Sequence, residues 1–178
     1  DHYSKHYDAM DIYVLDHNST DEFSEKLYHG AREGRYNAIP VHNEKWHFNI
    51  WMCTTVSLFQ WFLLQSYKTV LVCDCDEILY HSKLMDKLTY YKENGITVPR
   101  VNGHDMVSET FPTYDGELIT TKVKTGSEVY PPFCKNIIFN PKLDVQYGIG
   151  GHSFTCNNAN YSVSPELKLL HYKFLGIE

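Results

Sequence analysis

The sequence lacks a long hydrophobic run, and this absence excludes an ordinary membrane-spanning helix. The longest apolar segment, residues 55–64, is interrupted by Ser57 and Gln60, whereas a span needs about 20 mostly apolar residues. The first six residues are polar and do not resemble a signal peptide. Internal repeats, low-complexity tracts and an interdomain linker are also missing. We therefore expect no membrane span.

Basic residues are too few for a protein whose main partner is a nucleic acid. The chain has 16 Lys and Arg against 22 Asp and Glu, a formal net charge of -6, and neutralising phosphates requires clustered positive charge. The five cysteines are odd in number and lack zinc-finger spacing. We therefore expect no nucleic-acid partner, reduced thiols and a cytoplasmic location.

What the sequence does have is the length and composition of one globular domain. Its 178 residues are 43% hydrophobic and 21% charged, which is ordinary for a chain that buries one core. Aromatic residues make up 15%; they suit stacking on bases and sugar rings, although most of them are expected to fill the core.

Apolar runs and helix-spaced patterns alternate along the chain. Strands are predicted at residues 11–15, 38–41, 69–73, 96–101, 136–139 and 169–172, and helices at 19–31, 49–67 and 84–95. This alternation predicts an α/β fold with a mainly parallel central sheet flanked by helices. The helix at 49–67 is apolar almost all round and is predicted to be buried on more than one face. Residues 102–133 are predicted to form loops and a hairpin over a site.

Two acidic turns follow predicted strands, at residues 16–21 and 74–77. In a parallel sheet, ligands bind beyond the carboxyl ends of the strands. The second turn places Asp74, Asp76 and Glu77 directly after an apolar strand, where concentrated negative charge is costly unless a cation neutralises it. Mg²⁺ commonly uses one or two carboxylates together with substrate phosphates. The alternative is an acidic loop that faces solvent.

These two segments resemble the hallmark motifs of family-2-like glycosyltransferases with the GT-A fold. The likeness is strongest to the branch whose second motif reads apolar run, Asp-x-Asp-Glu, then two apolar residues, as residues 70–79 do. Residues 13–21, 135–139, 150–152 and 170–173 are also similar to that branch. The resemblance implies a metal-dependent hexosyl- or deoxyhexosyltransferase with a UDP- or TDP-sugar donor and a glycan or small hydroxyl acceptor. It also implies a Mn²⁺ or Mg²⁺ cofactor.

The resemblance also implies roles for individual residues. Asp16 would contact the uracil or ribose of the donor, and Asp74 the ribose or the water shell of the metal. Asp76 would bind the metal directly, while Glu77 would brace the turn. His152 or His171 would add a metal or diphosphate contact, with a hydrogen-bonded structural role as the alternative for each. Lys135 and Lys173 would balance diphosphate charge, with ordinary surface lysines as the alternative.

We expect an inverting reaction, which needs a base that deprotonates the acceptor hydroxyl. Asp105, Glu109, Asp115 and Glu117 all follow the metal-binding strand. We favour Asp105 because it stands just past the predicted end of the strand at 96–101. If the reaction retains configuration, no such base is needed.

Residues 1–178 are expected to form a single catalytic domain within a longer protein. The chain opens where the first helix of the family would end, so we expect that the usual first strand is left out or is replaced by another segment. Two rival interpretations remain open. One is a haloacid-dehalogenase-like phosphatase with Asp74 as nucleophile and Asp76 as acid and base; the other is a non-catalytic module that binds a nucleotide-sugar.

Overall fold

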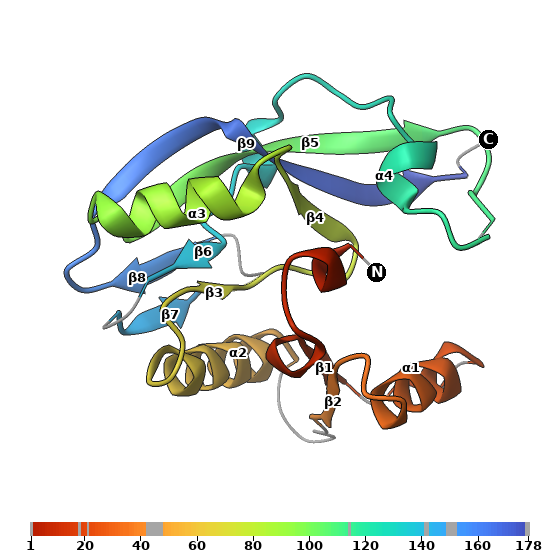
Figure 1. Ribbon diagram of the computed structural model, residues 1–178, viewed down its shortest axis with the longest axis horizontal. Helices are drawn as coiled ribbons and strands as arrows, with labels where there is room; N and C mark the ends of the chain where they lie inside the picture. The colour runs from red at the N-terminus through yellow and green to blue at the C-terminus, as the bar shows by residue number, and fades with distance from the viewer. Residues whose placement is uncertain are drawn as a thin grey trace. The chain divides into compact units, whose positions relative to one another are not determined.

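A computed structural model describes residues 2–17, 19–20, 22–41, 48–113, 115–140, 143–148 and 153–176. The chain divides into two compact units, Asp1–Phe48 and Asn49–Glu178, whose elements are labelled in Figure 1. Each unit is described by itself. The prediction of one catalytic domain over the whole chain is not decided by this division and stays a prediction.

The first unit pairs two parallel strands through a connecting helix. Strand β1 (Tyr13–Asp16) is followed by helix α1 (Glu22–Arg32) and strand β2 (Asn37–Pro40). The register pairs Tyr13 with Asn37 and Asp16 with Pro40. A helical crossover is the usual way to connect neighbouring parallel strands. These three elements confirm the strands predicted at 11–15 and 38–41 and the helix between them.

A three-stranded sheet organises the second unit. Its order is β4 (Glu77–Tyr80), β9 (Tyr161–Leu175), β5 (Val98–Ser108), with β9 running between the other two (Figure 1). Strand β4 pairs with β9 antiparallel, and β5 pairs with β9 parallel. Because β9 has a partner along both edges, it brings residues from distant parts of the chain into one cross-strand row.

Two short antiparallel pairs complete the described strands. Strand β3 (Val70–Leu71) pairs with β6 (Ile138–Phe139), and β7 (Val145–Tyr147) pairs with β8 (Phe154–Cys156). The protein is therefore a mixed α/β structure with small sheets. For the predicted parallel strand at 69–73, the partner found among the described residues is antiparallel. A continuous apolar run indicates that both faces of a strand are buried. Burial does not determine whether the neighbouring strand runs parallel or antiparallel.

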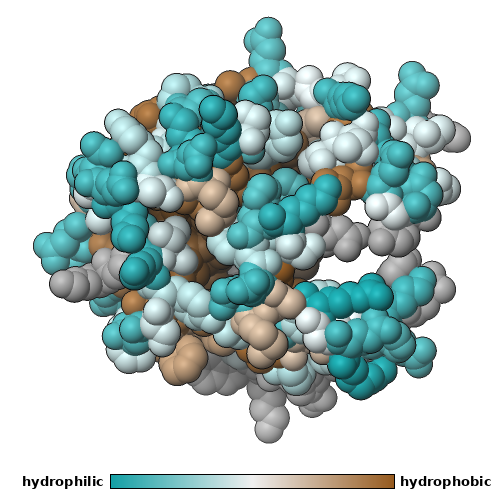
Figure 2. Space-filling model, in the orientation of Figure 1, coloured by the Kyte–Doolittle hydropathy of each residue, from teal (hydrophilic) through white to brown (hydrophobic). Residues whose placement is uncertain are grey.

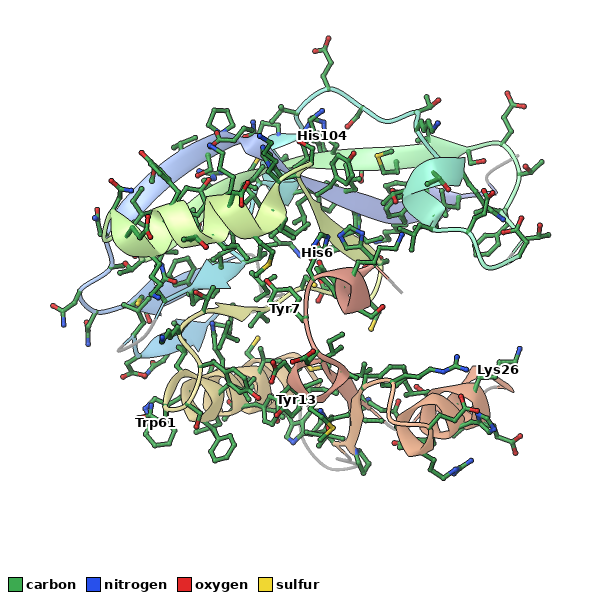
Figure 3. The ribbon with its side chains drawn as sticks, in the orientation of Figure 1. His6, Tyr7, Tyr13, Lys26, Trp61 and His104 are labelled. Atoms are coloured by element: carbon green, nitrogen blue, oxygen red, sulfur yellow. The ribbon has the colours of Figure 1, made fainter. Side chains whose placement is uncertain are left out.

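The long apolar helix α2 (Phe48–Leu64) is less covered than its sequence predicts. Leu63 and Leu64 are buried, but four large apolar side chains are more than half exposed, namely Ile50, Leu58, Trp61 and Phe62. Trp61 projects outward from this helix in Figure 3. The prediction of burial on more than one face is therefore wrong for this structure. No helix within the described residues is long and apolar enough to cross a membrane.

Helix α3 (Leu84–Glu93) follows the amphipathic pattern that the sequence predicts. Leu84, Leu88 and Tyr91 are buried, whereas the outward side of α3 is hydrophilic in Figure 2. The helix ends before Gly95, which has a φ of +66°, a left-handed conformation that glycine adopts without steric cost. The buried core of this unit includes Leu79, Val98, Val101, Ile138, Phe139, Leu167 and Leu169.

The segment predicted as loops and a hairpin, residues 102–133, differs from that prediction in two ways. Strand β5 continues through residues 102–108, and α4 (Ile119–Lys122) is a short helix within the segment predicted to form loops and a hairpin. The chain after α4 runs along the outer edge of β5: Ser127 N–H donates to the carbonyl of Asp105, and Tyr130 N–H to that of Gly103. The polar composition of residues 102–105 suggests a loop, but a paired edge satisfies their backbone groups equally well.

Gly103 allows a close backbone approach that positions this edge. A Cβ atom at Gly103 would lie 2.3 Å from the carbonyl oxygen of Phe133. Cβ atoms do not tolerate such a distance to backbone, so a larger residue would push the short 3-10 helix Pro131–Phe133 away from the strand. Glycine within a strand often marks such an approach.

We predict that Gly103→Ala lowers the free energy of unfolding by about 1–3 kcal/mol, the usual cost of overpacking. Urea denaturation followed by circular dichroism measures this change. Val107→Ala, at an exposed position of the same strand, is the control and should change stability by less than about 0.5 kcal/mol. Equal stability of Gly103→Ala and wild type would contradict the close packing at Gly103.

Candidate functional site

The acidic turn between β3 and β4 is held from inside by Glu77. The backbone N–H of Glu77 donates to the carbonyl of Asp74 at 3.1 Å, and Oε2 of Glu77 accepts the N–H of Asp74, also at 3.1 Å. The side chain of Glu77 is 1% exposed, compared with 68% for Asp74 and 45% for Asp76. Glu77 thus braces the turn, the role that the family resemblance implies for it, and the two aspartates project outward.

Lys135 neutralises the buried end of this turn. Its ammonium group bonds to Oε1 of Glu77 and lies 3.1 Å from Oδ2 of Asp74. The β3–β6 register pairs Leu71 with Ile138, and extending it by three residues places Asp74 opposite Lys135. The alternative of an ordinary surface lysine is wrong for Lys135, because its side chain is only 7% exposed. Its predicted role in balancing diphosphate charge stays a prediction.

The net pKa shift of Lys135 shows that pairing outweighs burial. Burial alone would lower the pKa of the ammonium group, but the hydrogen bond and charge of Glu77, together with the charge of Asp74, raise it above its ordinary value. Lys135 therefore stays charged and serves the protein's own carboxylates.

His171 is the middle residue of three ionisable side chains that lie side by side on neighbouring strands of the sheet. Strand register pairs His171 with Glu77 of β4 on one side and with Asp105 of β5 on the other. Directly paired residues point to the same face of a sheet. The row therefore follows from register, although His171 and Asp105 are 66 positions apart in the sequence.

Both nitrogens of the His171 ring face carboxylates. Nδ1 lies 2.8 Å from Oδ1 of Asp105, and Nε2 lies 3.4 Å from Oδ2 of Asp76. The imidazole is 7% exposed, and the ring of Phe133 packs against its face with centroids 4.4 Å apart. The ring is thus oriented by one hydrogen bond and one aromatic contact, and Nε2 points towards the acidic turn.

Asp76 is tied to the same strand through its backbone. The N–H of Tyr172 donates to the carbonyl oxygen of Asp76 at 2.7 Å, which extends the β4–β9 pairing to the residue beside His171. This bond places the half-exposed carboxylate of Asp76 next to His171, with one side open to solvent.

The cluster carries an excess of negative charge. Asp74, Asp76, Glu77 and Asp105 bring four formal negative charges, against the single positive charge of Lys135. Three negative charges therefore remain when His171 is neutral. Such an excess at a partly buried site favours a bound cation.

Asp16 belongs to the first unit and is engaged within it. Its Oδ1 accepts hydrogen bonds from the Ser19 backbone at 3.2 Å and the Ser19 hydroxyl at 2.6 Å, and its Oδ2 accepts one from the Tyr28 hydroxyl at 2.8 Å. The Ser19 hydroxyl is the main cause that lowers the pKa of Asp16, and burial opposes it. The predicted contact of Asp16 with a donor base or ribose stays a prediction.

An open depression of about 420 Å³ lies beside Tyr28 in the same unit. Its lining includes Tyr13, Tyr28, Tyr36 and Arg32. The ring of Tyr36 also packs closely on α1: its hydroxyl donates to the carbonyl of Leu27 at 2.9 Å. Aromatic and guanidinium groups at a shallow surface can stack on flat ligands, but here they also pack the helix onto the strands.

The structure brings together five of the seven predicted site residues: Asp74, Asp76, Asp105, Lys135 and His171. Asp105 lies inside strand β5 instead of past a strand end, so the stated reason for choosing it is wrong. His152 lies outside the described residues. The other proposed bases are exposed, and Asp115 forms an ion pair with Lys122.

Sequence reasoning missed the part that Phe133 and Gly103 play. Phe133 packs on the imidazole of His171, and Gly103 leaves room for its backbone. A glycine within a strand can signal a close backbone approach, but the polar neighbours of Gly103, Asn102 and His104, favour a loop. Nothing in the local sequence indicates which residue approaches.

The residues fit a cation only in part. Within the described part of the chain, no group of three His, Cys, Asp or Glu side chains is arranged to hold a metal ion. Asp76 and His171 nevertheless offer an oxygen and a nitrogen 3.4 Å apart. Mg²⁺ and similar hard cations usually keep several waters and substrate phosphates as ligands, so two protein ligands suffice.

No protein-family model matches the chain, and no curated protein matches it significantly.

We predict that Lys135→Met lowers the free energy of unfolding by about 3–5 kcal/mol, because it leaves the buried carboxylate of Glu77 without its counter-charge. Urea denaturation at pH 7 measures the change. Lys87→Met is the matched control: its partner Glu166 is 36% exposed, and surface pairs contribute about 0–1 kcal/mol. Similar losses for both variants would contradict a structural role of the buried pair.

The contribution of Asp16 to the stability of the fold depends on pH. The pKa of Asp16 is lower in the folded state than in the unfolded state, so its contribution to stability is present above the unfolded value. That contribution is lost as the pH falls through the folded value. Ser19→Ala removes the main cause and should raise the pKa of Asp16. An NMR titration of the carboxyl carbon measures it, with the adjacent exposed Thr20→Ala as control. An unchanged Asp16 pKa in Ser19→Ala would refute this attribution.

Proposed function

We propose that the chain is the catalytic core of a metal-dependent glycosyltransferase with a GT-A fold. It would transfer a sugar from a UDP- or TDP-linked donor to a hydroxyl group of a glycan or other acceptor. The proposal rests on the resemblance of residues 13–21 and 70–79 to the two family motifs. It also rests on the cluster at the end of the second motif.

The observation that carries the proposal is the pairing of Asp76 with His171. A half-exposed carboxylate and a buried imidazole nitrogen lie 3.4 Å apart, beside a turn with excess negative charge. Two residues 95 positions apart in the chain, 76 and 171, are both types that bind Mn²⁺. An acidic loop that merely faced solvent would not need a buried histidine aimed at it.

Each residue of the cluster then has a defined task. Asp76 and His171 would hold the cation on its protein side. One carboxylate oxygen of Asp74 accepts a hydrogen bond from Lys135. Because an ionised carboxylate can accept further hydrogen bonds, Asp74 would also accept one from a hydroxyl group of the donor ribose. When bound, the cation supplies Lewis-acid stabilisation of the leaving diphosphate. Lys135 and Glu77 hold the turn in place.

A thermal-shift screen tests this proposal. UDP-, GDP-, TDP- and CMP-sugars are added with and without Mn²⁺. We expect a rise in Tm that needs both the metal and a uridine or thymidine nucleotide, because a ligand that binds only the folded state stabilises it by about 2.7 kcal/mol at 100 times its Kd. Asp76→Ala and Asp76→Asn should abolish the rise.

Asp144→Ala, which removes an exposed aspartate elsewhere in the second unit, is the control and should keep the full response. Indifference of the wild-type chain to every metal and nucleotide pair would count against the transferase. Release of phosphate from an aryl phosphate would instead favour the phosphatase. Nucleotide binding without sugar transfer or donor hydrolysis would favour a non-catalytic module.

A further inference from the structure

We propose that Asp105 is a positioning residue that fixes the tautomer and orientation of His171, so that Nε2 serves as a metal ligand. Asp105 is then not the base that deprotonates the acceptor. This inference rests on the proposed function, because it assumes a divalent cation at Asp76. The protein would thus orient the metal-binding side chain of His171 before any donor binds.

The hydrogen bond between Asp105 and His171 sets the tautomer. An ionised carboxylate only accepts hydrogen bonds, so the 2.8 Å contact requires the proton of the imidazole on Nδ1. In the neutral ring, Nε2 then carries a lone pair. Metal-binding histidines commonly donate their other N–H to a carboxylate, which orients the ring and raises the basicity of the ligating nitrogen.

The contact on the other side of the His171 ring is longer than a charge-assisted hydrogen bond. A charge-assisted hydrogen bond between an imidazolium and a carboxylate spans about 2.7–2.9 Å, and Nε2 lies 3.4 Å from Oδ2 of Asp76. Nε2 of His171 and Oδ2 of Asp76 therefore do not form a short hydrogen bond with each other, and both atoms remain available to ligate a cation.

The backbone supports this arrangement on both sides of Asp105. The β5–β9 register shifts between Val101 and Asn102, and again between Asp105 and Val107. Residues 102–105 therefore form a short regular stretch between two irregularities, and it ends at the residue that contacts His171. Bulges often redirect a side chain next to a functional site.

Packing holds the imidazole plane in addition to the hydrogen bond. Phe133 covers one face of the ring, with an interplanar angle of 36°, and Phe174 meets the ring edge-on with centroids 6.4 Å apart. These two contacts, together with the hydrogen bond to Asp105, restrict rotation of the ring. Gly103 allows this position of Phe133, because a Cβ atom at residue 103 would clash with the carbonyl of Phe133.

Asp105 fits this positioning role better than the role of the base that deprotonates the acceptor hydroxyl. Its side chain is only 16% exposed, and Oδ1 is already engaged by the imidazole. A general base must lie within hydrogen-bond reach of the proton that it removes. The accessible carboxylates of the cluster are those of Asp74 and Asp76.

Mn²⁺ binding to the full chain tests the inference without any measurement of activity. Free Mn²⁺ is quantified by electron paramagnetic resonance, with and without UDP. We expect Asp105→Ala to weaken Mn²⁺ binding about 10- to 100-fold, the usual effect of losing such a partner. His171→Ala should weaken it at least as much. Asp105→Asn should lose less, because its amide oxygen can still accept the Nδ1 proton.

His104→Ala is the matched control. His104 is the neighbouring residue on β5 and is labelled in Figure 3. Its ring nitrogen bonds to the carbonyl of Ser127 at 3.0 Å, outside the cluster. This variant should bind Mn²⁺ as wild type does. Circular dichroism checks that every variant is folded.

Long-range ¹H–¹⁵N NMR of the metal-free chain gives an independent readout. It should find the proton of the neutral His171 ring on Nδ1 in wild type, and a mixture of both tautomers in Asp105→Ala. An Nε2 proton in wild type would overturn the inference. Wild-type chain that fails to bind Mn²⁺, even with UDP, would also overturn it.

The outcomes separate this inference from the proposed function. If Asp105→Ala and Asp105→Asn keep wild-type Mn²⁺ affinity but abolish sugar transfer, Asp105 is the base and the transferase proposal stands. If Mn²⁺ binds and depends on Asp105 but no nucleotide-sugar stabilises the chain, the transferase proposal fails and the positioning role stands.

Discussion

The buried ion pair between Lys135 and Glu77 is the constraint on which the acidic turn depends. A carboxylate that is 1% exposed is strongly destabilising without a partner, so the turn can adopt this conformation only with the ammonium group in place. Once Glu77 is held inside, the turn hydrogen bonds to the Asp74 backbone follow, and Asp74 and Asp76 are left at the surface. An interior interaction thus decides which acids are available for a ligand.

Strand β9 supplies the second half of the site. It pairs with β4 on one side and β5 on the other, so His171 is placed between an acidic turn and Asp105 by the register of two ladders. The ring then receives an orientation from Asp105 and Phe133. The proposed cation would complete this row, because it would neutralise charge that Lys135 alone does not balance. Structural and proposed functional roles are therefore divided among neighbours: Glu77 and Lys135 hold the turn, and Asp76 and His171 would hold the ligand.

Several features of the site could be predicted from local sequence, and others could not. The strand and helix at residues 11–32, the helix that ends before Gly95 and the acidic turn all follow from patterns within a few residues. Asp105 and His171 were both selected from the sequence, but their mutual contact was not. Lys135 was allowed as a surface residue because a lone lysine carries no local signal of burial. Residues 102–105 read as a loop because polar residues beside a glycine are usual in turns, and the edge that pairs with them lies more than 20 positions away.

The sequence by itself determined which residue types stand at the ends of its apolar runs, and hence that the chain contains a turn with concentrated negative charge. It also determined the mixed α/β character, since helix and strand periodicities are properties of short segments. Only the tertiary structure decided which acids are buried, which lysine pairs with them and which histidine faces them. These choices depend on strand register and on side chains that meet across 61 and 66 positions of the chain. Such contacts form because packing and charge pairing in the folded state offset the entropy of closing long loops, and no short stretch of sequence encodes that balance.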